Sequence, residues 1–314
     1  MPRYRILTWH VHGNYLYYLT QAPHDFYVLS KPGRPVGYGG RSGHLPWGDN
    51  VHDCPLEEAH KMRFDCVLFQ AKRHYLEDQH RLLSEHQRTL PRIYLEHDPP
   101  QQHPTDTRHL IDDPGTLLVH VTPFNALMWD SGPTPTWVIG HGVVVPENIA
   151  YSGAIERGIV VVNHLARRGR RLGADVFERV RKQVPLDLVG MAAEELGGIG
   201  EVRYPKLLAF EARYRFFFNP IRYTSLGLAV CEAMMLGMPI VALATTEMTT
   251  VIDNDVNGYA DTDVDRLIGV MRSLLHDPAL AHRWGEGAKR YAHERFNIHR
   301  FVGEWNRAFG YVCG

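Results

Sequence analysis

A short segment of the chain combines the groups needed to hold a phosphorylated ligand. It leads from a polar loop into an apolar stretch with helical spacing, and comprises Thr224, Ser225, Leu226, Gly227 and Leu228. The first N–H groups of a helix lack intrahelical acceptors and lie at the positive end of the helix dipole. Gly227 has no side chain to keep a bulky anion away from the backbone. The segment therefore predicts a phosphate site.

One carboxylate follows this predicted phosphate site. Glu232 lies about two turns into the expected helix, where a carboxylate can accept hydrogen bonds from both hydroxyls of a ribose. A buried helix with one solvated glutamate is the alternative, and the pattern leaves both interpretations open.

A basic cluster offers a second group for binding anions. Four arginines follow an apolar run at residues 158–162 that is expected to be a strand: Arg167, Arg168, Arg170 and Arg171. Guanidinium groups at the carboxyl end of a strand can hold a diphosphate through paired hydrogen bonds and stabilise its charge as it leaves. We predict this role for Arg167 and Arg171. A solvated basic loop is the alternative.

A longer stretch around the predicted phosphate site resembles a known signature. Residues 220–242, PIRYTSLGLAVCEAMMLGMPIVA, resemble that of GT-B glycosyltransferases of the family 4 type, or glycosyl transferases group 1. In this signature a proline ends a strand, a glycine opens a helix, and a glutamate and an alanine precede a G-x-P turn. The resemblance is strong over residues 158–305 and weak before residue 90. It implies a retaining, metal-independent transferase that uses a nucleotide-diphosphate sugar.

The resemblance also implies roles for single residues. Family members carry two glutamates eight positions apart; Glu232 matches the second, and Thr224 stands where the first normally faces the donor sugar. His97 matches a histidine that contacts the transferred sugar. Gly13 matches, loosely, a glycine of a loop that approaches the donor phosphates or the acceptor. Glu247 could replace a donor-binding glutamate of the next loop, although its register differs.

The sequence does not identify the donor or the acceptor. The donor nucleotide can be UDP, GDP or ADP, and the acceptor a glycan, a lipid-linked molecule or a small molecule. The family's basic loop carries an arginine and a lysine, whereas this chain reads RRGRRLGAD without a lysine. Two alternative functions are a GT-B-like sugar-nucleotide epimerase, whose catalytic carboxylates we cannot place, and a degenerate nucleotide-sugar-binding protein, suggested by Thr224.

Composition narrows the function classes further. The 314 residues, 44% of them hydrophobic, suffice for two domains. A net charge of -1 argues against nucleic acid as the main partner. The four cysteines lack disulfide-framework or C-x-x-C spacing, which favours a reducing cytoplasm. No signal-peptide pattern and no membrane-spanning apolar run occurs, so contact with a membrane is expected at most on its inner surface. The oligomeric state stays open.

Acidic triplets and histidines raise a metal hypothesis. DND at residues 253–255 and DTD at 261–263 have the D-x-D pattern that holds manganese in GT-A glycosyltransferases. Both flank a turn, and the second precedes an expected helix at residues 264–275, so we interpret them as turn and cap residues. His10 and His12 would share one face of a strand, but no third ligand follows at a recognisable spacing. We predict no metal and no other cofactor.

The pattern of apolar runs predicts an α/β protein of GT-B type, with two Rossmann-like domains facing each other across a cleft. We expect an N-terminal acceptor-side domain at residues 1–150, a nucleotide-sugar-binding domain at 151–290 and a C-terminal helix at 291–314. In the family this helix crosses back to the N-terminal domain; packing on its own domain is the alternative. Residues 31–47, with five glycines and three prolines, are expected to form a loop over the cleft or an acceptor-binding flap.

Further elements are expected from apolar periodicity. Strands are predicted at 5–9, 26–29, 66–69, 93–95, 117–121, 137–139, 158–162, 186–189, 216–218 and 240–244, and helices at 15–20, 72–88, 174–182, 225–236, 264–275 and 288–308.

Overall fold

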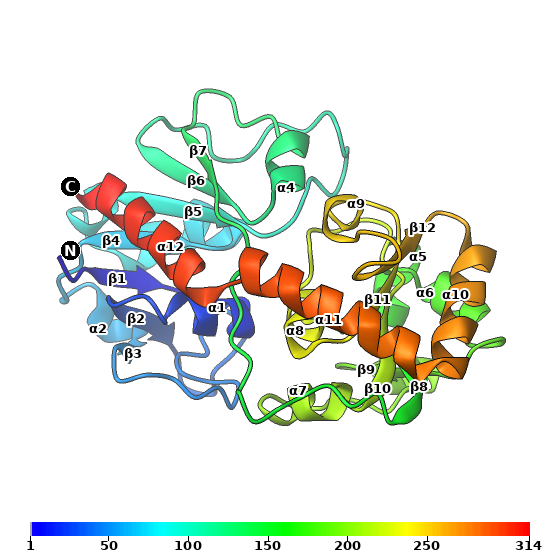
Figure 1. Cartoon of the computed structure of the whole chain (residues 1–314). Coiled ribbons are helices and arrows are strands. Elements are labelled where there is room, and N and C mark those ends of the chain that lie inside the picture. The colour runs from blue at the N-terminus through cyan, green and yellow to red at the C-terminus, as the bar shows by residue number, and fades with distance from the viewer. Residues whose placement is uncertain (1) are drawn as a thin grey trace. The chain divides into compact units, whose positions relative to one another are not determined.

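The computed structural model describes residues 2–314 as two compact units (Figure 1). Unit 1 comprises the chain up to Gly142 together with Ile298–Gly314, and unit 2 comprises Val143–Asn297. Each unit contains one parallel sheet with its own buried core.

The sheet of unit 1 has the strand order β3-β2-β1-β4-β5-β6-β7, and all neighbouring strands are parallel. Its strands are β1 (Arg5–Thr8), β2 (Asp25–Ser30), β3 (Val51–Pro55), β4 (Cys66–Phe69), β5 (Arg92–Glu96), β6 (Thr116–His120) and β7 (Thr136–Val138). The chain runs outward from β1 to β3 and then returns to β4 on the other side of β1. The carboxyl ends of β1 and β4 therefore form a topological switch point, which is where such sheets bind ligands.

Helices cover the sheet of unit 1. They are α1 (Gly13–Leu19), α2 (Leu56–Ala59), α3 (Gln79–Leu82), α4 (Pro123–Met128) and α12 (Ile298–Cys313). Although α12 is encoded far from the others, it packs on α1 and β4 (Figure 1). Its Phe301, Trp305 and Phe309 are fully buried, and the Trp305 indole N–H donates to the Tyr15 hydroxyl at 3.3 Å. The residues after Asn297 thus complete the core of unit 1.

The sheet of unit 2 has the order β12-β11-β10-β8-β9 and is again parallel. Its strands are β8 (Ile155–Val161), β9 (Leu186–Val189), β10 (Tyr214–Asn219), β11 (Ile240–Leu243) and β12 (Gly258–Asp261). Its helices are α5 (Leu165–Leu172), α6 (Ala174–Val180), α7 (Lys206–Glu211), α8 (Leu228–Leu236), α9 (Met248–Val251), α10 (Val264–His276) and α11 (Pro278–Arg295). Here the switch point lies between the carboxyl ends of β8 and β10.

Several predicted elements are confirmed. The strands at 66–69 and 186–189 have the predicted bounds. Gly237 ends α8 with φ of 94°, the left-handed conformation that favours glycine at this position. Asp263 caps α10, because its side chain accepts a hydrogen bond from the backbone N–H of Asp265. The segment 31–47 contains no helix or named strand.

The predicted helix at residues 72–88 is confirmed only over residues 72–82. The segment contains a π-helix (His74–Asp78), α3 and a short 3₁₀-helix (Gln87–Thr89). Ser84 and Gln87 exchange two hydrogen bonds between side chain and backbone, at 3.0 and 3.2 Å. Such local bonds compete with helical ones and stop the helix before Ser84.

Three further boundaries differ from the sequence prediction. Helix α8 begins at Leu228 rather than at Ser225, because Gly227 has the extended backbone of a cap residue. The helix predicted at 288–308 is divided into α11 and α12 by two residues at 296–297. Strand β3 was not predicted. It pairs only with β2, and an edge position tolerates the polar side chains and the proline that obscure its pattern.

Candidate functional site

Three loops of unit 2 are joined by hydrogen bonds at the carboxyl edge of its sheet. The carbonyl of Arg171, in α5, accepts the backbone N–H groups of Arg222 at 3.0 Å and Tyr223 at 3.2 Å. The Thr245 hydroxyl, which follows β11, donates to the carbonyl of Ile221 at 2.9 Å. The segments after β8, β10 and β11 therefore form one connected surface at the switch point.

Gly173 permits a close approach between two of these segments. Its φ is 84°, and a Cβ atom at this position would lie 2.0 Å from the carbonyl oxygen of Pro220. A side chain here would push apart the end of α5 and the loop that follows β10. The sequence alone did not identify this glycine as part of the site.

Charge is unevenly distributed in the basic cluster. The Asp175 carboxylate accepts from Arg170 at 2.6 Å and from Arg222 at 2.6 and 2.8 Å. These bonds, those of Arg222 foremost, hold the pKa of Asp175 below its ordinary value. Within residues 2–314, by contrast, the guanidinium groups of Arg167 and Arg171 pair with no carboxylate. Arg167 is exposed and Arg171 half-buried, so both remain available to an anionic ligand.

The N-terminus of α8 follows the loop after β10 and belongs to the same surface. Gly227 is its N-cap residue, and a Cβ atom there would meet nothing within 4 Å. The N–H groups of Val230 and Cys231 donate to the Gly227 carbonyl at 3.1 and 3.4 Å, so the N–H groups before them, at Leu228 and Ala229, are the ones without an intrahelical acceptor. Ser225 precedes the helix and is half-buried like Thr224, whereas the side chain of Leu226 is buried, so Leu226 can serve a ligand only through its backbone.

Two carboxyl groups are buried behind this helix end. Glu232, just over one turn from the start of α8, is 1% exposed. Glu211, the last residue of the neighbouring α7, is fully buried, and neither of its carboxyl oxygens has a hydrogen-bond partner among residues 2–314. Burial and the nearby charge of Glu232 raise the pKa of Glu211 well above its ordinary value. Glu211 was not predicted from the sequence, because no motif around it in FEARY marks a buried carboxyl group.

The carboxylate of Glu247 forms an ion pair and a hydrogen bond within unit 2. Glu247 is buried, and its carboxylate accepts from Arg295 of α11 at 2.9 Å and from the Thr250 hydroxyl at 3.1 Å. This ion pair joins the start of α9 to the end of α11. The donor-binding role expected for Glu247 stays a prediction, and these contacts fix the position of its carboxylate.

In unit 1, a glutamine fixes the orientation of His97. The amide nitrogen of Gln70, directly after β4, donates to the Thr8 hydroxyl and the Trp9 carbonyl, each at 3.0 Å. The amide oxygen therefore faces His97 and accepts from its Nε2 at 3.2 Å. A neutral His97 then carries its proton on Nε2 and a lone pair on Nδ1. Gln70 was missed from the sequence, although its place at the end of a strand was a usable signal.

His97 lies in a cluster at the switch point of unit 1. Its ring centroid is 4.2 Å from that of His12 and 4.9 Å from that of Tyr15. Burial, followed by the proximity of His12 and His141, lowers the pKa of His97 well below its ordinary value, so the ring stays neutral near pH 7. Gly13, the first residue of α1, directly follows His12. The structure thus brings Gly13 and His97 to the same edge of the sheet.

The predicted common face of His10 and His12 is wrong. The strand ends at Thr8, and the Nδ1 atom of His10 lies 2.7 Å from the carbonyl of Gly40, whereas His12 contacts His97. Throughout residues 2–314, no group of three or more His, Cys, Asp or Glu side chains is placed to hold a metal ion. The triplet at 261–263 contains an internal hydrogen bond, in which the Asp261 carboxylate accepts the backbone N–H of Asp263 at 2.8 Å.

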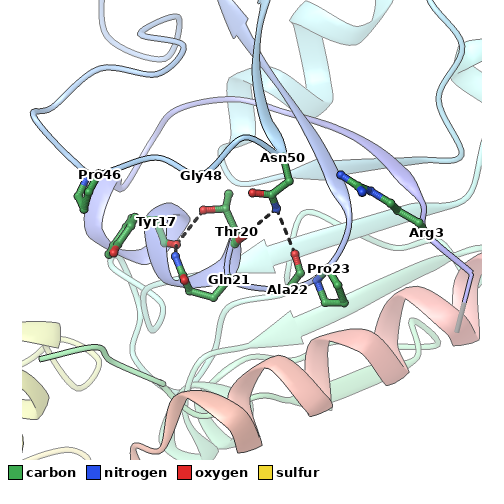
Figure 2. A pocket seen from close by; sticks show the side chains of 9 residues that line it. All are labelled: Arg3, Tyr17, Thr20, Gln21, Ala22, Pro23, Pro46, Gly48 and Asn50. Atoms are coloured by element: carbon green, nitrogen blue, oxygen red, sulfur yellow. Dashed lines mark hydrogen bonds between the residues drawn. The ribbon is translucent and has the colours of Figure 1, made fainter. Parts of the chain in front are cut away.

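A cavity of about 340 Å³ in unit 1 is lined by none of the candidate site residues described above (Figure 2). It is lined by the end of α1 and by the loop before β3, where the Asn50 side chain donates to the carbonyls of Thr20 and Ala22 at 2.9 and 3.2 Å. Because Asn50 directly precedes β3, the cavity lies at the amino edge of the sheet. It does not include the switch-point residues.

No helix within residues 2–314 is both long and apolar enough to cross a bilayer.

One protein family matches part of the chain. Residues 193–291, which include α8 and its preceding loop, match the family described as Glycosyl transferases group 1. No curated protein sequence matches the chain.

Solved structures share the fold over most or nearly all of the chain. HepE from Anabaena, in complex with UDP-glucose, has a TM-score of 0.71 at 14% identity, covering 99% of this chain and 100% of that one. Sucrose-phosphate synthase from Thermosynechococcus elongatus has a TM-score of 0.68 at 15% identity, covering 99% of each chain. TarM from S. aureus has a TM-score of 0.58 at 16% identity, covering 81% and 58%. The chain therefore has the GT-B fold, with two Rossmann-like sheets.

Proposed function

We propose that this glycosyltransferase moves a sugar from a nucleotide-diphosphate sugar to an acceptor hydroxyl with retention of configuration and without a metal ion. The observation that carries the proposal is the connected surface of unit 2, where unpaired arginines and the N-terminus of α8 meet at the switch point. Two independent anion-binding groups at one sheet edge suit a diphosphate better than a single phosphate.

The diphosphate, the ribose and the sugar of the donor each have a proposed partner in unit 2. Arg167 and Arg171 bind the diphosphate, together with the N–H groups from Ser225 to Leu228. Glu232 accepts the ribose hydroxyls, which requires a small opening of its buried environment. Thr224 lies at the start of the same loop and is proposed to face the donor sugar.

From unit 1, we propose that His97 contacts the transferred sugar and that Gly13 approaches the donor phosphates or the acceptor. The Nδ1 lone pair of a neutral His97 would accept a hydrogen bond from a sugar hydroxyl. In unit 2, we propose that Glu247 takes part in donor binding, with its carboxylate held in place by Arg295.

In the proposed reaction, the bond between the anomeric carbon and the diphosphate oxygen breaks as the acceptor oxygen approaches the same face of the sugar. The leaving diphosphate takes the proton of the acceptor hydroxyl. Arg167, Arg171 and the helix N-terminus stabilise the negative charge that develops on the diphosphate. The negative charge on the leaving diphosphate is thus stabilised by groups of the protein itself.

A screen of donors followed by turnover tests this function. Ligands that bind only the native state raise the unfolding temperature, so UDP-, GDP- and ADP-sugars are compared first, beginning with the UDP-glucose that HepE binds. A sugar-labelled donor that gives a stabilising shift is then incubated with glycan, lipid-linked and small-molecule acceptors. Transfer or slow hydrolysis, unchanged by EDTA, supports the proposal. Epimer formation, binding without turnover, or activity lost to EDTA and restored by manganese would each overturn it.

A further inference from the structure

Two cysteines of unit 1, far apart in sequence, lie next to each other. Cys66 is the first residue of β4 and is fully buried, and Cys313 is the last residue of α12 and half-buried. The thiol of Cys313 donates to the carbonyl of Asp65, the residue before Cys66, at 3.8 Å. The contact occurs where α12 packs on β4 (Figure 1).

The two thiols also interact directly. The proximity of Cys66 lowers the pKa of Cys313, while the proximity of Cys313, together with burial, raises the pKa of Cys66 well above its ordinary value. Cys313 therefore loses its proton first, and it is also the cysteine that reaches solvent. An accessible thiolate is the reactive form of cysteine.

The other two cysteines do not share this environment. Cys54 and Cys231 are both buried, so neither presents its thiol to solvent as Cys313 does. Cys54 donates to the sulfur of Met62 at 3.7 Å, and burial raises its pKa to about 11. Cys54 thus provides an internal control for unspecific oxidation.

We propose that Cys66 and Cys313 form a dithiol site that a low-molecular-weight disulfide, such as oxidised glutathione, converts reversibly into an intrachain disulfide. This site is independent of the transferase chemistry, since it lies at the start of β4, at the opposite edge of the sheet from Gln70 and His97.

The exchange proceeds in two balanced steps. The Cys313 thiolate attacks one sulfur of the oxidant, whose S–S bond breaks to leave a mixed disulfide and one small thiolate. Cys66 passes its proton to that small thiolate and attacks the Cys313 sulfur, which expels the second small thiolate. Two protein thiols are oxidised and one oxidant disulfide is reduced to two thiols; the second small thiolate regains the proton first lost by Cys313.

The new bond would close a loop of roughly 250 residues, and a cross-link of this length removes many conformations from the unfolded chain. It would tie the last turn of α12 to the amino edge of the sheet in unit 1. We therefore expect oxidation to raise the unfolding temperature, and a reducing thiol to reverse the rise.

Intact-mass spectrometry of the full chain tests the proposal. The reduced protein is incubated with oxidised glutathione, quenched in acid and analysed without reductant. Wild type and Cys54→Ser should each lose the mass of two hydrogens, with a peptide that joins Cys66 to Cys313, while Cys313→Ser should not.

Two outcomes would overturn the site. One is a chain that keeps glutathione on Cys313 and forms no internal bond; the other is equal loss of two hydrogens in Cys313→Ser. Because Cys313 is half-buried at a helix end, its serine variant is expected to fold, and circular dichroism checks this. The result therefore does not depend on a variant at the buried Cys66.

Discussion

At the scale of single residues, the unit 2 site contains arginines that pair with a carboxylate and arginines that do not. Asp175 pairs with both Arg170 and Arg222, whereas no carboxylate in residues 2–314 pairs with Arg167 or Arg171. Function in this cluster is therefore expected from the two arginines that have no carboxylate partner.

Replacing Arg167 or Arg171 by alanine should lower kcat at saturating donor about a hundredfold or more, the usual scale for one group that stabilises a transition state. Because the interaction strengthens as charge develops, kcat should fall more than KM rises. Lysine should rescue only partly, since it lacks the guanidinium fork. Steady-state kinetics checks this against Arg179→Ala on α6, whose arginine pairs with Asp265 at 2.7 Å. If both alanine variants kept the wild-type kcat, the cluster would have to be interpreted as a solvated basic loop.

Removing the carboxylate of Glu232 tests the ribose contact. Glu232→Ala should weaken nucleotide binding by roughly 1.5–3 kcal/mol, the range for a hydrogen bond to a charged group. Calorimetry with the nucleotide identified by the donor screen measures this loss, and circular dichroism confirms folding. Unchanged affinity in a folded variant would reject the role.

Glu211 should make stability depend on pH. Its pKa is raised in the folded state, so its stabilising contribution is complete below the unfolded pKa of about 4.3 and is lost as pH rises through the folded pKa. Glu211→Gln, which is neutral and similar in shape, should therefore be more stable than wild type at neutral pH, by a margin that grows with pH. Urea unfolding from about pH 5 to pH 9 measures the margin.

The matched control for this pH series is Glu286→Gln, an exposed carboxylate of α11. Its stability should follow that of wild type at every pH. A pH-independent margin for Glu211→Gln, or one that shrinks as pH rises, would contradict the assignment of a protonated carboxyl group.

At the scale of secondary-structure elements, backbone contacts hold the site together. The carbonyl of Arg171 joins the end of α5 to the loop after β10, and Gly173 leaves room for this contact. The positions of the ligand-binding groups therefore depend on glycine and carbonyl groups as much as on side chains.

Gly173→Ala should separate these elements. A left-handed backbone costs a residue with a side chain about 1–3 kcal/mol, and the added Cβ would also collide with Pro220. We expect a lower unfolding temperature and weaker donor binding. Gly169→Ala is the matched control, because Gly169 also has positive φ, of 57°, but a Cβ there would meet nothing within 4 Å. Equal donor affinities for the two variants would refute the positioning role of Gly173.

This dependence on backbone also explains what the sequence could predict. The buried strands at 66–69 and 186–189 and the glycine cap at Gly237 follow from local patterns, and so they were predicted correctly. The bond between Arg171 and Arg222 joins residues about fifty positions apart through main-chain atoms, which no residue type encodes. Glu211 was missed for a similar reason, because its burial arises only when α7 packs on α8.

At the scale of the whole molecule, the chain passes from unit 1 to unit 2 and back. Unit 2 is one continuous segment, while unit 1 needs both the first sheet and α12. Each unit has its own buried core, so local damage should stay local.

Trp305→Ala tests this independence. Truncating a fully buried tryptophan costs about 3–5 kcal/mol, and the bond to Tyr15 is lost as well. Hydrogen exchange measured by mass spectrometry should show weaker protection of β1, β4 and α1, with little change in β10 and α8. Trp305→Phe, which keeps most of the ring, serves as the milder control. Equal loss of protection in both units would contradict independent cores.

The return of the chain to unit 1 has a consequence for synthesis on the ribosome. All of unit 2 is translated before the helix that completes unit 1, so the nascent chain can fold the second unit while the first still exposes the apolar surface around Tyr15 and Phe26. The first unit to emerge is therefore the last to finish folding. During that interval, we expect the unfinished surface to be a binding site for chaperones.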